Sequence, residues 1–187
     1  IDEVVLHRSL LRVSPFRWLR HQLILWGFGL MFAVEILAVF LREAVPAFGL
    51  PDLWRTPGHP LRLAFDFAFD FTGLMILIGC ILALVFRLRA HGTAEQKFTD
   101  TPSAVFLLLV VLTGFIVEGM RIAGSLHDPY HAASPIGLLF AYTLGDPTRG
   151  SKALTDAVWL FHALAACAFI AYVPLKRLVH SCATPLG

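Results

Sequence analysis

Charged residues are scarce in this sequence. Asp, Glu, Lys and Arg make up only 15% of its 187 residues, whereas 57% are hydrophobic, and the mean hydropathy is +0.73. A soluble domain cannot bury this much apolar surface, so the composition excludes a soluble globular protein and indicates an integral membrane protein. The formal net charge of only +2 provides no broad basic surface, which excludes nucleic-acid binding.

Cysteine is also rare. Cys80, Cys167 and Cys182 lie in separate segments without a C-x-x-C spacing, so the pattern indicates neither a zinc site nor a disulfide framework. We expect them to be small apolar packing residues. The sequence has no initial methionine and no signal-peptide pattern, and it stops directly after an apolar run. We therefore expect it to be part of a longer polypeptide.

The sequence contains several long apolar runs. Four of them are long enough to cross a hydrocarbon core of about 30 Å at about 1.5 Å per residue, and they cover approximately residues 18–41, 64–88, 102–124 and 154–180. A shorter run at 134–144 is expected to lie along the membrane interface. The sequence thus predicts an all-α fold, in which residues 1–187 form a single membrane domain built as a bundle of four transmembrane helices.

The distribution of basic residues predicts the orientation of this bundle. Lys and Arg are more frequent before the first run, between the second and third runs and after the fourth run than in the other two connections. The positive-inside rule therefore predicts that both ends of the chain face the cytoplasm.

Three histidines lie at related depths in the predicted bundle. His162 and His180 are eighteen residues apart, which corresponds to about five helical turns and a rise of about 27 Å, so they share one helix face near opposite membrane surfaces. His21 begins the first run at the depth of His180. A single such histidine is explained by anchoring at the interface or by a hydrogen bond. Three at matched depths indicate a shared ligand, and two facing imidazoles are the axial pair that a haem iron requires.

The segments that carry these histidines resemble a known family. WLFHALAACAFIAYVPLKRLVHSCATP resembles the last membrane helix of the cytochrome b (gamma) subunits of respiratory nitrate reductases, and of related domains in heterodisulfide reductase-like and electron-transfer-flavoprotein:menaquinone oxidoreductase-like complexes. RHQLILWGFGLMF is similar to the second helix of that family, and TDTPSAVFLLLVVLTGFIVEGMRI to the fourth. The resemblance extends from about Arg8 onward, and the family's first helix is expected before residue 1.

The resemblance implies two b-type haems stacked across the bilayer, each held by two histidines. By position, His21 and His180 resemble the pair for the haem nearer the cytoplasm, and His162 resembles one ligand of the distal haem. The family's partner of His162 falls at Met31, which is a departure from its pattern. Methionine is an axial ligand that raises a haem potential, and it is also a common packing residue.

Other sources for the missing distal ligand stay open. His59, with His127 and His131, lies in a loop on the outer side and could supply an imidazole by folding inward. The distal haem could also be absent.

Carboxylates near the outer end of the bundle are candidates for quinone and proton chemistry. Asp66 and Asp70 are one helical turn apart and face the same way, so they could accept protons from a quinol. Pairing with Arg62, or placement near a helix N-terminus, is the structural alternative. Glu118 with Arg121 has the same two interpretations, and an ion pair is the simpler one.

Further residues are assigned to the haems through the resemblance. Arg121 on the outer side and Lys176 on the cytoplasmic side could neutralise haem propionates. Among the glycines inside the runs, Gly27 and Gly114 are candidates for positions where a haem ring presses against the backbone. Close approach of two helices is the alternative explanation for such glycines.

The predicted function is that of a di-haem cytochrome b in a prokaryotic cytoplasmic membrane. It would transfer electrons between menaquinone or another quinone and an iron–sulfur protein, or a fused heterodisulfide reductase-like domain, on the cytoplasmic side. One alternative is a haem-free membrane anchor of a redox complex. Another is a proton channel or transporter that uses intramembrane acids such as Glu35, for which four helices without an inverted repeat provide little material.

Overall fold

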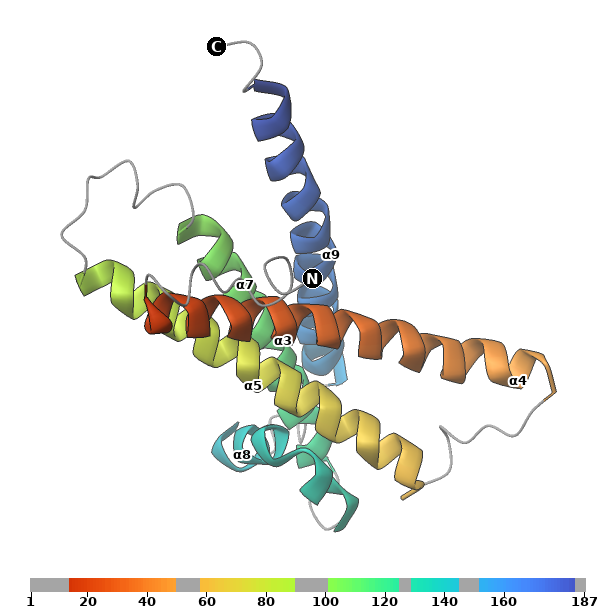
Figure 1. Ribbon diagram of the computed structural model, residues 1–187. Coiled ribbons are helices and arrows are strands. Elements are labelled where there is room, and N and C mark those ends of the chain that lie inside the picture. The colour runs from red at the N-terminus through yellow and green to blue at the C-terminus, as the bar shows by residue number, and fades with distance from the viewer. Residues whose placement is uncertain (1–13, 50–57, 90–100, 125–128, 145–151, 184–187) are drawn as a thin grey trace.

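The computed structural model describes residues 14–49, 58–89, 101–124, 129–144 and 152–183, without the side chains of Thr101, Pro129 and residues 173–183. Over these ranges the chain is helical and contains no strand (Figure 1). The elements are α3 (Pro15–Val39), the π-helical turn η1 (Phe40–Ala44), α4 (Val45–Ala47), α5 (Pro60–Arg89), α7 (Thr101–Ala123), the 3-10 turn η2 (Pro129–Ala133), α8 (Pro135–Leu144) and α9 (Lys152–Ala183). The predicted all-α fold is confirmed.

Four of these helices are long and apolar enough to cross a membrane. They are Pro15–Ala47, Pro60–Arg89, Pro102–Ala123 and Lys152–Tyr172, each overlapping one of the predicted runs. The shorter apolar helix expected at 134–144 is α8. Large apolar side chains such as Phe67 and Phe71 on α5 are about half exposed, as expected of a surface that faces lipid.

The first membrane helix begins and ends at recognisable signals. The Ser14 hydroxyl accepts a hydrogen bond from the Arg17 amide at 3.4 Å, and Pro15 follows as the first helical residue. The helix continues past residue 41, because the wider turn η1 carries it up to Pro46, which lacks the amide hydrogen for a regular turn. Gly49, with a φ of 74°, then ends it.

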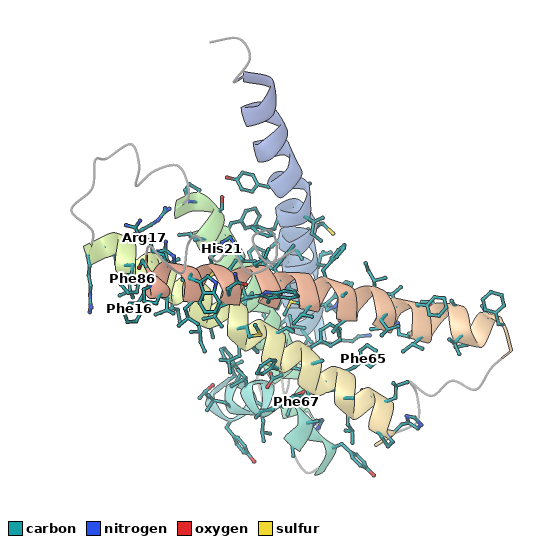
Figure 2. The ribbon with its side chains drawn as sticks, in the orientation of Figure 1. Phe16, Arg17, His21, Phe65, Phe67 and Phe86 are labelled. Atoms are coloured by element: carbon teal, nitrogen blue, oxygen red, sulfur yellow. The ribbon has the colours of Figure 1, made fainter. Side chains whose placement is uncertain are left out.

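Helices α3 and α5 pack along each other through glycines (Figure 1). A methyl group on Gly27 would lie 2.8 Å from Cγ1 of Ile76, and one on Gly79 would lie 2.7 Å from Cγ1 of Ile24. The rings of Phe16 and Phe86 meet with centroids 5.8 Å apart, which joins the start of α3 to the end of α5 (Figure 2). The two helices are therefore antiparallel, and close helix approach accounts for Gly27.

Helix α7 occupies the centre, because it packs against α5, α8 and α9. Its contact with α8 is close: a methyl group on Gly119 would lie 2.7 Å from Cβ of Phe140. The buried core comprises Ile76, Cys80, Leu107, Val111, Phe115 and Phe169. Phe169 of α9 makes edge-on ring contacts with Phe28 of α3, at 5.8 Å, and with Phe106 of α7, at 5.4 Å. These contacts place α9 across α7 and α3.

Candidate functional site

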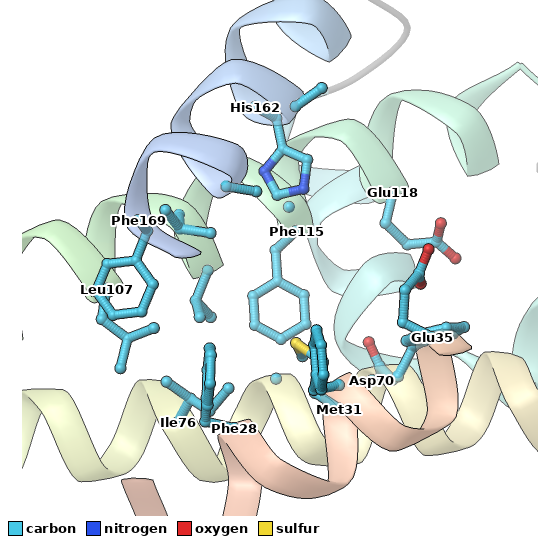
Figure 3. Close-up of a pocket in the computed structure, with 18 of the residues that line it drawn as sticks. Phe28, Met31, Glu35, Asp70, Ile76, Leu107, Phe115, Glu118, His162 and Phe169 are labelled. Atoms are coloured by element: carbon cyan, nitrogen blue, oxygen red, sulfur yellow. The ribbon is translucent and has the colours of Figure 1, made fainter. Parts of the chain in front are cut away.

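A cavity of about 570 Å³ lies between α3, α5, α7 and α9. Its size falls within the range of about 300–1,000 Å³ that is typical of ligand and cofactor sites. Most of its wall is apolar, and the polar exceptions are His162, four carboxylates, Ser134 and Cys167. Figure 3 shows His162 projecting from α9, with Phe115 of α7 between it and Met31 of α3. The cavity therefore brings together two residues that the sequence suggested as ligands of the distal haem.

The imidazole of His162 is held by α7. Its Nδ1 atom lies 3.0 Å from the Oγ1 atom of Thr113. The ring also lies against Gly114, where a methyl group would be 3.2 Å from the Cε1 atom of His162. Of the glycines considered for contact with a cofactor, Gly114 is thus the one that lines the cavity, and Gly27 faces α5 instead.

One end of the cavity is acidic. Glu35, Asp70 and Glu118 gather on one side of the view in Figure 3, and Asp66 also lines the wall. The side chains of Asp66 and Asp70 therefore face the same space, as their spacing predicts.

Two of these four carboxylates are held tightly. Asp70 accepts hydrogen bonds from the amides of Ile136 and Gly137, at 2.7 Å and 3.1 Å, and so caps the N-terminus of α8. Glu118 forms a two-point ion pair with Arg121, at 2.6 Å and 2.9 Å. The ion pair expected between these two residues is therefore present.

The other two carboxylates are held less tightly. Asp66 lies 3.9 Å from Arg62, a distance that gives a weak ion pair. Glu35 forms no ion pair with another residue that the structure describes. Asp66 and Glu35 are therefore the two acids at this end without a short ion pair or backbone hydrogen bond of the kind that holds Glu118 and Asp70.

The remaining described histidines lie away from the cavity wall. His59 precedes α5, where its Nδ1 atom accepts a hydrogen bond from the Leu61 amide at 3.2 Å. His131 is buried in η2, which packs against α5. His21 lies on α3 with its Nε2 atom buried and does not line the cavity. Among the proposed partners of His162 that the structure describes, only Met31 lines the cavity.

Some predicted site residues fall outside what is described. His127 lies in the undescribed segment 125–128, and Lys176 and His180 lie on α9 where side chains are not described. The predicted pairing of His21 with His180 stays a prediction. In the described part of the chain, no group of three or more His, Cys, Asp and Glu side chains is arranged to hold a metal ion.

The structure adds residues that the sequence did not single out. Phe28 and Phe115 supply flat apolar walls of the cavity. Glu35, which the sequence suggested only for a proton channel, lies at the acidic end. Thr113 contacts His162 although the two lie 49 positions apart in the chain. A threonine within a run of leucine and valine gives no sign of its partner, because only the packing of α7 against α9 brings the two together.

Comparison with known proteins identifies a family and several relatives. The sequence model of the nitrate reductase gamma subunit family matches residues 13–187. A subunit of the dihydromethanophenazine:CoB–CoM heterodisulfide reductase of Methanosarcina acetivorans is 30% identical over 100% of this chain and 63% of its own length. The EtfAB:quinone oxidoreductase of Syntrophomonas wolfei is 28% identical over 93% of the chain and 25% of its own length. The chain thus spans less than two thirds of these relatives. No solved structure matches it.

Proposed function

The chain belongs to the nitrate reductase gamma subunit family, and from this membership and the cavity at His162 we propose that it is a membrane cytochrome b. In this role it carries electrons between a quinone pool and a redox partner on the cytoplasmic side of a prokaryotic membrane. The partner is an iron–sulfur protein or a fused heterodisulfide reductase-like domain. Relatives named as part of a heterodisulfide reductase and as a quinone oxidoreductase support this proposal.

The observation that supports the proposal most directly is the setting of His162. A histidine that binds a metal with one ring nitrogen usually makes a hydrogen bond with the other, and Nδ1 of His162 has such a partner in Thr113. The aromatic and aliphatic wall of the cavity suits the faces of a porphyrin. The residues present therefore fit a haem, and a bound haem would supply one-electron transfer within the bilayer.

Each proposed haem has its own ligands. His162 and Met31 would hold the distal haem, since both line the same cavity, and the ring of Phe115 would turn out of the space between them. His21 and His180 would hold the haem nearer the cytoplasm, with Lys176 beside one of its propionates. Arg121 forms an ion pair with Glu118. To neutralise a propionate of the distal haem as well, Arg121 would have to contact both carboxylates.

We place quinone exchange at the acidic end of the cavity. There Asp66 and Glu35 would accept the protons that a quinol releases as its electrons leave. Glu118 keeps its ion pair with Arg121, and Asp70 keeps α8 in position. Menaquinone, or another quinone with a flat apolar ring, would fit between the aromatic walls.

Counting haems tests the proposal. The pyridine haemochrome assay on the purified protein is expected to give two haems per chain, and His162→Ala should reduce this to one. His59→Ala is the matched control, because His59 accepts a hydrogen bond from the start of α5 and does not line the cavity, and two haems should remain.

Other outcomes favour the alternatives. A protein without dithionite-reducible b-type bands would be a haem-free anchor. An unchanged haem count in His162→Ala would remove the proposed distal site. Proton flux across vesicles without any haem would favour a channel.

A further inference from the structure

Thr113 is the side chain that contacts the ring of His162 at Nδ1. Its hydroxyl oxygen lies 2.9 Å from the carbonyl oxygens of both Leu109 and Val110, and 3.0 Å from Nδ1 of His162. All three partners are within hydrogen-bond distance. The hydroxyl is therefore placed between the backbone of α7 and the imidazole from α9.

This arrangement favours one position for the hydrogen of the imidazole ring. A hydroxyl has a single hydrogen, and a carbonyl oxygen can only accept. Both carbonyl distances are 2.9 Å, which favours a hydroxyl hydrogen directed to the helix backbone, and the oxygen of Thr113 then accepts a hydrogen bond from His162. Nδ1 of His162 is then the protonated nitrogen, and Nε2 keeps its lone pair.

The neighbouring residue leaves room for the ring. A methyl group on Gly114 would lie 3.2 Å from Cε1 and 3.7 Å from Nε2 of His162. A side chain at this position would therefore press on the imidazole. Thr113 and Gly114, adjacent on α7, thus lie against the same ring, Thr113 at Nδ1 and Gly114 nearest to Cε1.

We propose that Thr113 is a positioning residue that fixes His162 in the form able to bind iron through Nε2. The inference rests on the proposed function, in which His162 is an axial ligand. Accepting the Nδ1 hydrogen raises the basicity of the ring, so Thr113 would also lower the reduction potential of the haem that His162 holds.

The chain contains a matched control in Thr72. Its hydroxyl lies 2.7 Å and 3.2 Å from the carbonyl oxygens of Ala68 and Phe69, and it has no side-chain partner among the described residues. Thr72→Val and Thr113→Val thus remove the same kind of bond to a helix backbone. Only the second also removes a bond to a histidine.

The experiment compares Thr113→Val, Thr113→Ser and Thr72→Val with the unaltered protein, in membranes that contain the whole protein. Loss of such a supporting hydrogen bond typically weakens metal binding about 10- to 100-fold. Thr113→Val should therefore lower occupancy of one haem, raise its midpoint potential and change its electron paramagnetic resonance g-values. Thr113→Ser should restore all three readouts, and Thr72→Val should change none of them.

The result also separates the two proposals. If His162→Ala loses one haem while Thr113→Val keeps the potentials and g-values of the unaltered protein, the role of Thr113 is wrong and the proposed function stands. If His162→Ala keeps every haem, His162 is not an axial ligand. The proposed function is then wrong, and the inference on Thr113 is wrong with it. Where Thr113→Val does not accumulate, Thr113→Ala takes its place, and equal potentials in Thr113→Ala and Thr113→Ser would overturn the inference.

Discussion

Asp70 of α5 caps α8, a helix that begins 65 residues later at Pro135. Its Oδ2 atom accepts a hydrogen bond from the amide of Ile136 at 2.7 Å, and its side chain is buried. An acid inside a membrane domain costs free energy unless it has partners. The N-terminus of α8 provides them, since two amide groups there have no partner within their own helix.

Replacing Asp70 should therefore loosen α8. Removal of a capping side chain costs about 0.5–2 kcal/mol, so Asp70→Ala should lower the free energy of unfolding in detergent by about 1–2 kcal/mol. Asp70→Asn keeps one carbonyl oxygen and should lose less. Thermal unfolding of both variants measures the difference, and equal stability of Asp70→Ala and the unaltered protein would contradict the capping role.

The number and type of the helices could be predicted from the sequence. A run of about 20 apolar residues has few alternatives to a membrane helix, and each of the four predicted runs is helical. The ends were less predictable. Helix α3 continues to η1 and α4 because a wider turn precedes Pro46, and hydropathy does not encode such a turn.

The candidate site was predictable only in part. Spacing and resemblance predict His162 and Met31 as ligands, and both line one cavity. Thr113 and the capping role of Asp70 were not predicted, because both depend on partners more than 40 residues away in the chain. Spacing along one helix identifies a shared face, whereas the residue opposite that face is decided by packing.

The contact between α3 and α5 gives a prediction with a built-in control. A methyl group on Gly27 would lie 2.8 Å from Ile76, whereas one on Gly29 meets nothing within 4 Å. Overpacking costs about 1–3 kcal/mol, so Gly27→Ala should destabilise the protein by about that amount. Gly29→Ala should leave it unchanged or slightly more stable. Thermal unfolding in detergent distinguishes them, and equal effects would mean that the helices lie further apart.

Met31 offers a spectroscopic prediction. If its sulfur binds the distal iron, Met31→Leu should remove that ligand and shift one haem toward a high-spin spectrum. Met31→His should restore a low-spin haem with a lower potential, because methionine raises haem potentials relative to histidine. Met75→Leu is the control, since Met75 lies on α5 against Gly27 and does not line the cavity. Identical spectra for Met31→Leu and Met75→Leu would make Met31 a packing residue.

The acidic end of the cavity can be tested by removing one proton acceptor at a time. Asp66→Asn and Glu35→Gln change the charge of a side chain in the cavity wall without changing its size. A positioned proton acceptor contributes about 10²- to 10⁴-fold to a rate, and two acids share the task here. Each variant should therefore slow the reduction of haem by quinol about 10-fold, with the haem spectrum intact.

Glu43→Gln is the control for that measurement. Glu43 lies in η1, further along the same membrane helix as Glu35, and forms an exposed ion pair with Arg42 at 2.8 Å. Its removal should leave the rate unchanged, because it does not line the cavity. Stopped-flow absorbance in the haem bands gives the rates. If Asp66→Asn and Glu35→Gln both match Glu43→Gln, quinol gives up its protons elsewhere, and the cavity at His162 would serve the haem alone.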